Sequence, residues 1–106
     1  MTPVNPNVYC NKFATGRIAP GTNPTRIINI AQNGYIQIMP LETNVKPLYI
    51  GVGTTGGGIT NNNLLTSGHI IYENGFMLSF ADLSQIYVIA ENETDSFTFF
   101  AAYIDC

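Results

Sequence analysis

The sequence predicts an all-β fold, a small antiparallel β-sandwich of about seven to eight strands. Short segments rich in Ile, Val, Tyr and Phe recur along the chain, and clusters of Gly, Pro and Asn separate them. No segment has the 3.6-residue periodicity of an amphipathic helix. Because the chain has 106 residues, we expect one domain with one core, at residues 8–106. Residues 1–7, which include two prolines, read as an extended N-terminal arm.

Two Asn-Gly pairs predict tight turns, because a two-residue type I′ turn requires positive φ at both positions. Asn33-Gly34 predicts a hairpin between residues 27–30 and 35–38. Asn74-Gly75 predicts a second hairpin, between residues 69–72 and 76–80. With these hairpins, strands are expected near residues 8–14, 26–31, 35–39, 46–52, 69–73, 76–80, 86–91 and 96–104.

The last two expected strands, near residues 86–91 and 96–104, are apolar at successive positions instead of alternating with polar residues. Strands of this kind are buried on both faces. In a two-layer sandwich only one face of each sheet meets the core, so a loop or another subunit is expected to cover the other face. The pattern therefore predicts a homo-oligomer. At most one short helical turn is expected, near residues 81–85.

Charged residues make up 10% of the chain, and the net charge is −3. Since the four basic residues are scattered, the sequence has no positive patch for nucleic acid or for anionic lipid, and neither partner is expected. The N-terminus lacks the pattern of a signal peptide, and no apolar run suits a membrane span. We expect synthesis in a cytosol. There, reduction disfavours a disulfide between Cys10 and Cys106, whose spacing also does not suit a metal.

Residues 51–56 (GVGTTG) match the G-x-G-x-x-G pattern of dinucleotide-binding loops and follow an expected strand. The residues that follow include Gly57, Gly58 and Asn61-Asn62-Asn63, which do not favour the helix that would hold a pyrophosphate. The Gly-Lys-Ser/Thr ending of a phosphate-binding P-loop is also missing. No cofactor is expected.

Few residues suggest catalysis or metal binding. His69, the single histidine, has no neighbouring Cys or paired carboxylate and is expected at a strand edge in a polar pocket. Glu91, Glu93 and Asp95 offer oxygen ligands for a cation, but their spacing matches no calcium loop and a solvated turn is favoured. Asn92-Glu93-Thr94 fits a glycosylation acceptor, which is relevant only to a secreted eukaryotic protein. Neither a metal site nor an enzyme is expected.

Several segments resemble a pattern of small structural proteins of tailed bacteriophages. Residues 23–30 (NPTRIINI) are similar to that family's Asn-Pro-x-Arg opening strand, and residues 47–51 (PLYIG) to its P-V-Y-I-G strand. A Gly/Thr/Asn loop then leads to residues 64–69 (LLTSGH), and residues 83–91 (LSQIYVIAE) resemble the strand L-x-x-I-Y-V-I-A-E. The resemblance implies a non-enzymatic β-sandwich in a virion. Such domains decorate heads, cement capsomers, or form part of a fibre, collar or tail.

The expected partners are other copies of the chain and other virion proteins, such as the major capsid protein or neighbouring head or tail proteins. The N-terminal arm and the loop at residues 53–67 are expected to need an external partner to become ordered. The arm contains prolines, which cannot complete a strand ladder, and the loop contains glycines, which lose much conformational entropy on ordering. The candidate contacts are Thr2, Val4, Asn5, Thr54, Thr55, Thr60, Asn61, Asn62 and Asn63, together with Phe100 and Ile104 on the last strand.

A carbohydrate-binding sandwich is the alternative class. It requires a shallow site with exposed aromatic rings and hydrogen-bonding amides, for which the candidates are Tyr35, Tyr72 and Asn61-Asn62-Asn63. The absence of Trp weighs against it.

Overall fold

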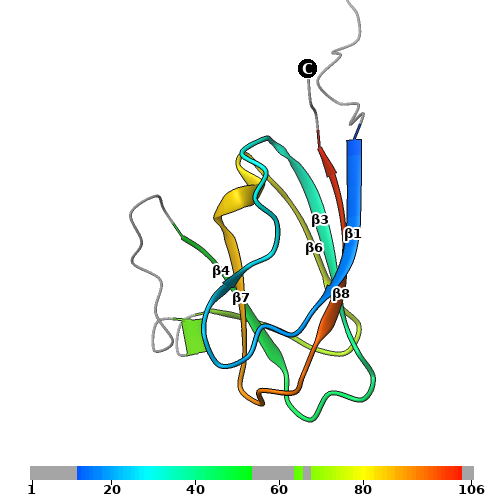
Figure 1. The fold of residues 1–106 in the computed structure, drawn as a ribbon, viewed down its shortest axis with the longest axis vertical. Helices are drawn as coiled ribbons and strands as arrows, with labels where there is room; N and C mark the ends of the chain where they lie inside the picture. The colour runs from blue at the N-terminus through cyan, green and yellow to red at the C-terminus, as the bar shows by residue number, and fades with distance from the viewer. Residues whose placement is uncertain (1–11, 54–63, 66–67, 104–106) are drawn as a thin grey trace, which may run out of the picture.

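The computed structural model describes residues 12–53, 64–65 and 68–103. Within these residues, eight strands form two antiparallel sheets of four strands each, which lie face to face (Figure 1). The all-β class and the β-sandwich are therefore confirmed. In the described part of the chain, no helix is long and apolar enough to cross a bilayer.

We name the two sheets A and B. Sheet A contains, in spatial order, β1 (Lys12–Ile18), β8 (Phe97–Tyr103), β3 (Gly34–Pro40) and β6 (Phe76–Phe80). Sheet B contains β2 (Thr25–Arg26), β7 (Ile86–Ala90), β4 (Leu48–Val52) and β5 (His69–Ile71). In Figure 1 the label of β1 lies on the right and the labels of β4 and β7 on the left.

The helical turn predicted near residues 81–85 is confirmed as a 3-10 turn, η2 (Leu83–Gln85), directly before β7. The expectation of at most one such turn is wrong, because residues 64–65 are also helical. Asp82 caps η2: its Oδ1 accepts a hydrogen bond of 3.0 Å from the backbone N–H of Ser84. The strand expected at residues 26–31 is much shorter, because β2 contains only two residues.

The hairpin predicted at Asn33-Gly34 is wrong. The preceding strand, β2, belongs to sheet B, whereas β3 belongs to sheet A and pairs with β6 and β8. Neither Asn33 nor Gly34 has positive φ. Gly34 serves a different purpose: a Cβ atom at this position would overlap the carbonyl oxygen of Ala102 and lie 2.8 Å from the Cα of Tyr103. The glycine therefore permits a close approach of two strands.

The hairpin predicted at Asn74-Gly75 is also wrong, although a turn is present. The N–H of Gly75 donates a hydrogen bond of 2.9 Å to the carbonyl of Tyr72, and Gly75 has a φ of 87°. However, β5 lies in sheet B and β6 in sheet A. The turn therefore carries the chain from one sheet to the other, and it is not a type I′ turn because Asn74 does not have positive φ.

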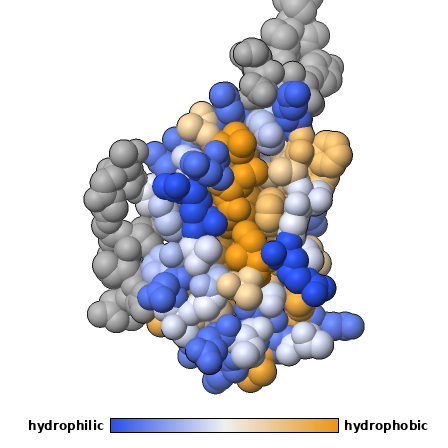
Figure 2. Space-filling model, viewed as in Figure 1, coloured by the Kyte–Doolittle hydropathy of each residue, from blue (hydrophilic) through white to orange (hydrophobic). Residues whose placement is uncertain are grey.

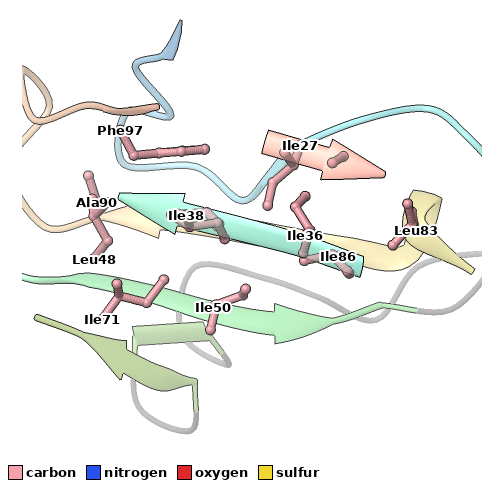
Figure 3. Packing of buried hydrophobic residues seen from close by; sticks show 12 residues of the cluster. Ile27, Ile36, Ile38, Leu48, Ile50, Ile71, Leu83, Ile86, Ala90 and Phe97 are labelled. Atoms are coloured by element: carbon pink, nitrogen blue, oxygen red, sulfur yellow. The ribbon is translucent and has the colours of Figure 1, made fainter. Parts of the chain in front are cut away.

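The hydrophobic core lies between the sheets (Figure 3). Inward-pointing residues of alternating strand positions meet there, as the two-residue strand period requires. Figure 2 shows that apolar residues also reach the surface in a strip along the seam between the sheets. The buried core residues are Ile27, Ile36, Ile38, Leu48, Ile50, Ile71, Leu83, Ile86, Val88, Ala90, Phe97 and Ala101.

The expectation of burial on both faces holds for β7 and fails for β8. In β7, Ile86 and Val88 belong to the core cluster, and Ile89 points away from it yet is fully buried. In β8, Phe97 is buried against the core, whereas Phe100 is 36% exposed. The outer face of sheet A is therefore open in this single chain.

Candidate functional site

The outer face of sheet A is the first candidate site. The strand registers align its residues in rows across the sheet: Ala102 of β8 lies opposite Phe13 of β1 and Tyr35 of β3. In the next row, Phe100 lies opposite Thr15 and Gln37. The outer face consists of Phe13, Thr15, Arg17, Tyr35, Gln37, Met39, Met77, Ser79, Thr98, Phe100 and Ala102.

An aromatic cluster occupies part of this face. The rings of Phe13 and Phe100 are stacked, with centroids 5.7 Å apart and planes 13° apart. The ring of Tyr35 is tilted against Phe100, at 6.1 Å and 47°. These contacts hold the three rings together above Ala102, which is buried beneath them.

The apolar side chains of the outer face are accessible to a partner. Phe13 is 69% exposed and Met77 is 58% exposed, and Met39 is also exposed. Among the eleven residues of the face, Arg17 is the single charged one. A partner would therefore cover apolar and neutral polar groups with little charge to desolvate.

A groove at one end of the sandwich is the second candidate site, and its volume is about 590 Å³. We call it the end groove. One wall is the connection between β3 and β4, at the lower end of the molecule in Figure 1. The other wall is the turn after β5. The residues that line the end groove are Pro40, Leu41, Glu42, Asn44, Val45, Lys46, Pro47, Ile71, Tyr72, Glu73 and Asn74.

The first wall is held by residues that precede β8. The carboxylate of Asp95, which is 2% exposed, accepts hydrogen bonds of 2.8 Å each from the backbone N–H groups of Val45 and Lys46. The side chain of Asn44 forms two hydrogen bonds with the backbone of Ser96: its Nδ2 donates to the carbonyl, and its Oδ1 accepts from the N–H. This wall is therefore pre-organised.

The second wall is the tight turn that Gly75 closes. A Cβ atom at Gly75 would overlap the sulfur of Met39 and lie 2.7 Å from the carbonyl oxygen of Ile38, so the turn packs closely against β3. Tyr72, at the start of this turn, is 60% exposed and lines the end groove. The groove thus presents an accessible aromatic ring on a fixed backbone.

Tyr49 lies close to this turn on sheet B. Its hydroxyl donates a hydrogen bond of 3.1 Å to Oε1 of Glu91. Partial burial and then the neighbouring Glu91 raise the pKa of the Tyr49 phenol above its usual value of 10.0, with a smaller contribution from Tyr72. The neutral phenol is thus the form that this environment favours.

Most of the predicted assembly contacts lie outside the described residues. They are Thr2, Val4, Asn5, Thr54, Thr55, Thr60, Asn61, Asn62, Asn63 and Ile104. Phe100 is the predicted contact that lies within the described residues. It is on the outer face of sheet A, where its ring contacts those of Phe13 and Tyr35. Sequence reasoning missed Phe13, Met39 and Met77, although the strand alternation around each of them is a signal that identifies the shared face.

The carbohydrate candidates are not brought together. Tyr35 lies on the outer face of sheet A, beside Phe100, whereas Tyr72 lines the end groove. The Asn61-Asn62-Asn63 run lies outside the described residues.

His69 is the first residue of β5, an edge strand of sheet B, so its expected position at a strand edge is confirmed. The expected polar pocket is wrong, because the imidazole is exposed and lies 4.9 Å from the ring of Phe76.

The prediction of a solvated turn at Glu91, Glu93 and Asp95 is correct for the two glutamates and wrong for Asp95. Glu91 and Glu93 are exposed, but Asp95 is buried and its carboxylate binds the backbone of the first groove wall. Across residues 12–53, 64–65 and 68–103, no three His, Cys, Asp or Glu side chains are grouped to hold a metal ion. Cys10, Cys106 and part of the G-x-G-x-x-G segment lie outside these ranges.

Comparison of the chain with family models, with curated proteins and with solved structures finds no match.

Proposed function

We propose that this protein is a non-enzymatic structural component of a bacteriophage virion, made in the host cytoplasm and assembled through the outer face of sheet A. A head-associated role, as a capsid decoration or cement protein, is the first choice. A tail, collar or fibre position is the alternative. The observation that carries the proposal is the open face on which Phe13, Met77 and Phe100 are exposed.

The outer face has the composition of an interface. Aromatic and methionine side chains are enriched in the cores of protein interfaces, whereas charged residues are depleted there. The Phe13 and Phe100 rings are already stacked, so binding orders few additional side chains. Apolar patches of this kind on soluble proteins mark sites of interaction.

The size of the face also suits association. Three strands of seven residues and one of five, at about 3.4 Å per residue and spaced about 4.8 Å apart, give a flat area on the order of 400 Å². Side-chain relief increases the accessible area beyond this value. A standard interface uses about 800 Å² from each partner. The outer face is thus a substantial part of one such interface.

The first occupant of this face is a second copy of the chain. Two copies with a net charge of −3 each repel one another. A contact through a face whose single charge is Arg17 brings no acidic groups together. A homo-oligomer built through this face then binds the neighbouring proteins of the particle.

The assignment to a virion rests on the resemblance of residues 23–30, 47–51, 64–69 and 83–91 to small phage structural proteins. In the structure, residues 47–51 include most of β4, and residues 83–91 include η2 and β7. These two segments contribute Leu48, Ile50, Ile86 and Val88 to the core, which supports a shared architecture. The position of the protein in the particle, on the head or on the tail, collar or fibre, is given by the second stage of the experiment below.

The experiment has two stages. First, the oligomeric state of the purified chain is measured by light scattering, for the wild type and for the double variant Phe13→Glu/Phe100→Glu. The matched control is Val45→Glu, because Val45 is 66% exposed but lies in the end groove. We expect an oligomer for the wild type and the control, and a folded monomer for the double variant.

In the second stage, each form is incubated with particles of the phage that encodes it, assembled without the protein, and co-sedimentation is measured. We expect the wild type to saturate the particles and the density of the protein to lie on the head. A monomeric wild type that ignores every particle component contradicts the proposal. Density on the tail, collar or fibre supports the virion role and replaces the decoration assignment.

A further inference from the structure

We propose that the end groove is a binding site for a neutral oligosaccharide, with Tyr72 as the surface on which a sugar ring stacks. This site is separate from the outer face of sheet A, so the inference goes beyond the proposed structural role and does not rest on it. The proposal rests on three features that occur in one groove: an exposed tyrosine, side chains that accept or donate hydrogen bonds, and two fixed walls.

The groove has the dimensions of a ligand site. Its volume of about 590 Å³ falls within the range of roughly 300–1,000 Å³ that is typical of small-ligand sites. Two chain segments distant in sequence, at residues 40–47 and 71–74, form its walls. A short run of sugar rings is a ligand that fits such an open groove along its length.

The apolar part of the lining matches the C–H face of a pyranose. Tyr72 is 60% exposed and its amphipathic ring has an apolar body with a hydroxyl at one end. Val45 is 66% exposed, and Pro47 and Leu41 add further apolar surface. An aromatic ring that is accessible in a groove offers a stacking surface to a ligand with an apolar face.

The polar part of the lining matches hydroxyl groups. Glu42 and Glu73 supply acceptors, whereas Lys46 and the amide of Asn74 supply donors. A sugar hydroxyl both donates and accepts, so it can use both kinds of partner. With two carboxylates beside one ammonium group, the groove has a weakly negative balance, which disfavours an anionic ligand and leaves a neutral one.

The walls are fixed before any ligand binds. Asp95 holds the backbone of Val45 and Lys46, and Asn44 is bonded to Ser96 through both ends of its amide. Since these hydrogen bonds already satisfy the loop, sugar binding pays little for ordering it. Pre-organisation matters here because each sugar contact is weak by itself.

The test is an NMR titration of the ¹⁵N-labelled full chain with maltotriose, cellotriose and triacetylchitotriose, each up to 10 mM. We expect at least one of them to shift amide signals of residues 41–46 and 72–75. Tyr72→Ala should lower the affinity about tenfold, whereas Tyr72→Phe should retain most of it, because stacking uses the ring. The matched control is Tyr35→Ala, which removes a tyrosine from the outer face of sheet A and should leave binding unchanged.

Three results would overturn the proposal. One is the absence of shifts with all three trisaccharides while the spectrum is that of a folded protein. Another is unchanged binding by Tyr72→Ala. The third is a pentalysine peptide that binds the groove more tightly than every sugar, which would assign the site to basic peptides. None of these results depends on the oligomeric state, so this test and that of the structural role fail independently.

Discussion

The carboxylate of Asp95 accepts a hydrogen bond of 2.8 Å from the backbone N–H of Val45, a residue of the connection between β3 and β4. Its second oxygen accepts from the next N–H, of Lys46. One buried side chain thus satisfies two backbone donors that belong to no strand ladder. The turn before β8 therefore fixes the backbone of a loop that lies 50 residues earlier in the sequence.

Replacing Asp95 by Ala should strongly destabilise the domain. The variant leaves two N–H groups without their acceptor in a buried site, at a cost of about 2–4 kcal/mol in the free energy of unfolding. Urea denaturation followed by circular dichroism measures this cost. Glu93→Ala is the control, because Glu93 is exposed in the same turn and its removal should change stability by less than about 0.5 kcal/mol. Equal effects of the two substitutions would contradict the structural role of Asp95.

The outer face of sheet A should contribute little to the stability of a single chain. Phe13 is 69% exposed, so Phe13→Ser in a monomeric background should cost less than about 1 kcal/mol. Ile36 is fully buried, and Ile36→Ala should cost about 2–5 kcal/mol. Thermal or urea denaturation at low protein concentration compares them. A large cost for Phe13→Ser in the monomer would mean that the ring stabilises the fold rather than an interface.

Two glycines should respond to alanine for different reasons. At Gly34 the new Cβ atom would overlap the Ala102 carbonyl oxygen, so β3 and β8 must separate, at a cost of about 1–3 kcal/mol. At Gly21 nothing lies within 4 Å of the new atom, but φ is 71°, which costs about 1 kcal/mol of backbone strain. We expect Gly34→Ala to be the more destabilising change in urea denaturation, and the reverse order would refute the close approach of the strands.

The raised pKa of Tyr49 predicts a dependence of stability on alkaline pH. A phenol whose folded pKa lies above its unfolded value of 10.0 contributes stability that is complete below pH 10 and is lost as the pH rises through the folded pKa. Glu91→Gln removes the carboxylate and should bring the pKa of Tyr49 back toward its usual value. Ultraviolet titration of each protein, with the matching Tyr49→Phe variant subtracted, isolates this phenol. An unchanged titration in Glu91→Gln would exclude the contribution of Glu91.

The positions of the strands could be predicted from sequence, but their partners could not. Most expected strands overlap observed ones, because β-branched and aromatic residues mark them locally. The hairpins that the two Asn-Gly pairs predict are not formed, because the flanking strands belong to different sheets. Local sequence indicates that the chain turns at Asn74-Gly75, but whether the next strand joins the same sheet depends on contacts with distant residues such as Ile36 and Ile38, which pair with β6.

The candidate sites could likewise be predicted only in part. The sequence indicates Tyr72 as a candidate aromatic contact and Phe100 as a residue of a strand that is apolar on both faces. The end groove itself was not predictable, since its wall depends on Asp95, which the sequence presents as one of three acidic residues in a solvated turn. The outer face required the register that places Phe13 opposite Ala102, and register is set by tertiary pairing.

The alternation of the chain between the two sheets has a kinetic consequence. Among the eight described strands, β4 and β5 are the only pair that is adjacent both in sequence and in a sheet, whereas β1 pairs with β8. In a nascent chain, β1 therefore cannot form its pairing with β8 until β8 has been synthesised. Since loop closure over such distances slows folding, this domain should have a high contact order and fold in milliseconds to seconds once β8 is available. Truncation within β8 would remove the strand partner of β1 and would leave β3 paired with β6 alone, so the smallest unit that folds should include nearly all of the described strands.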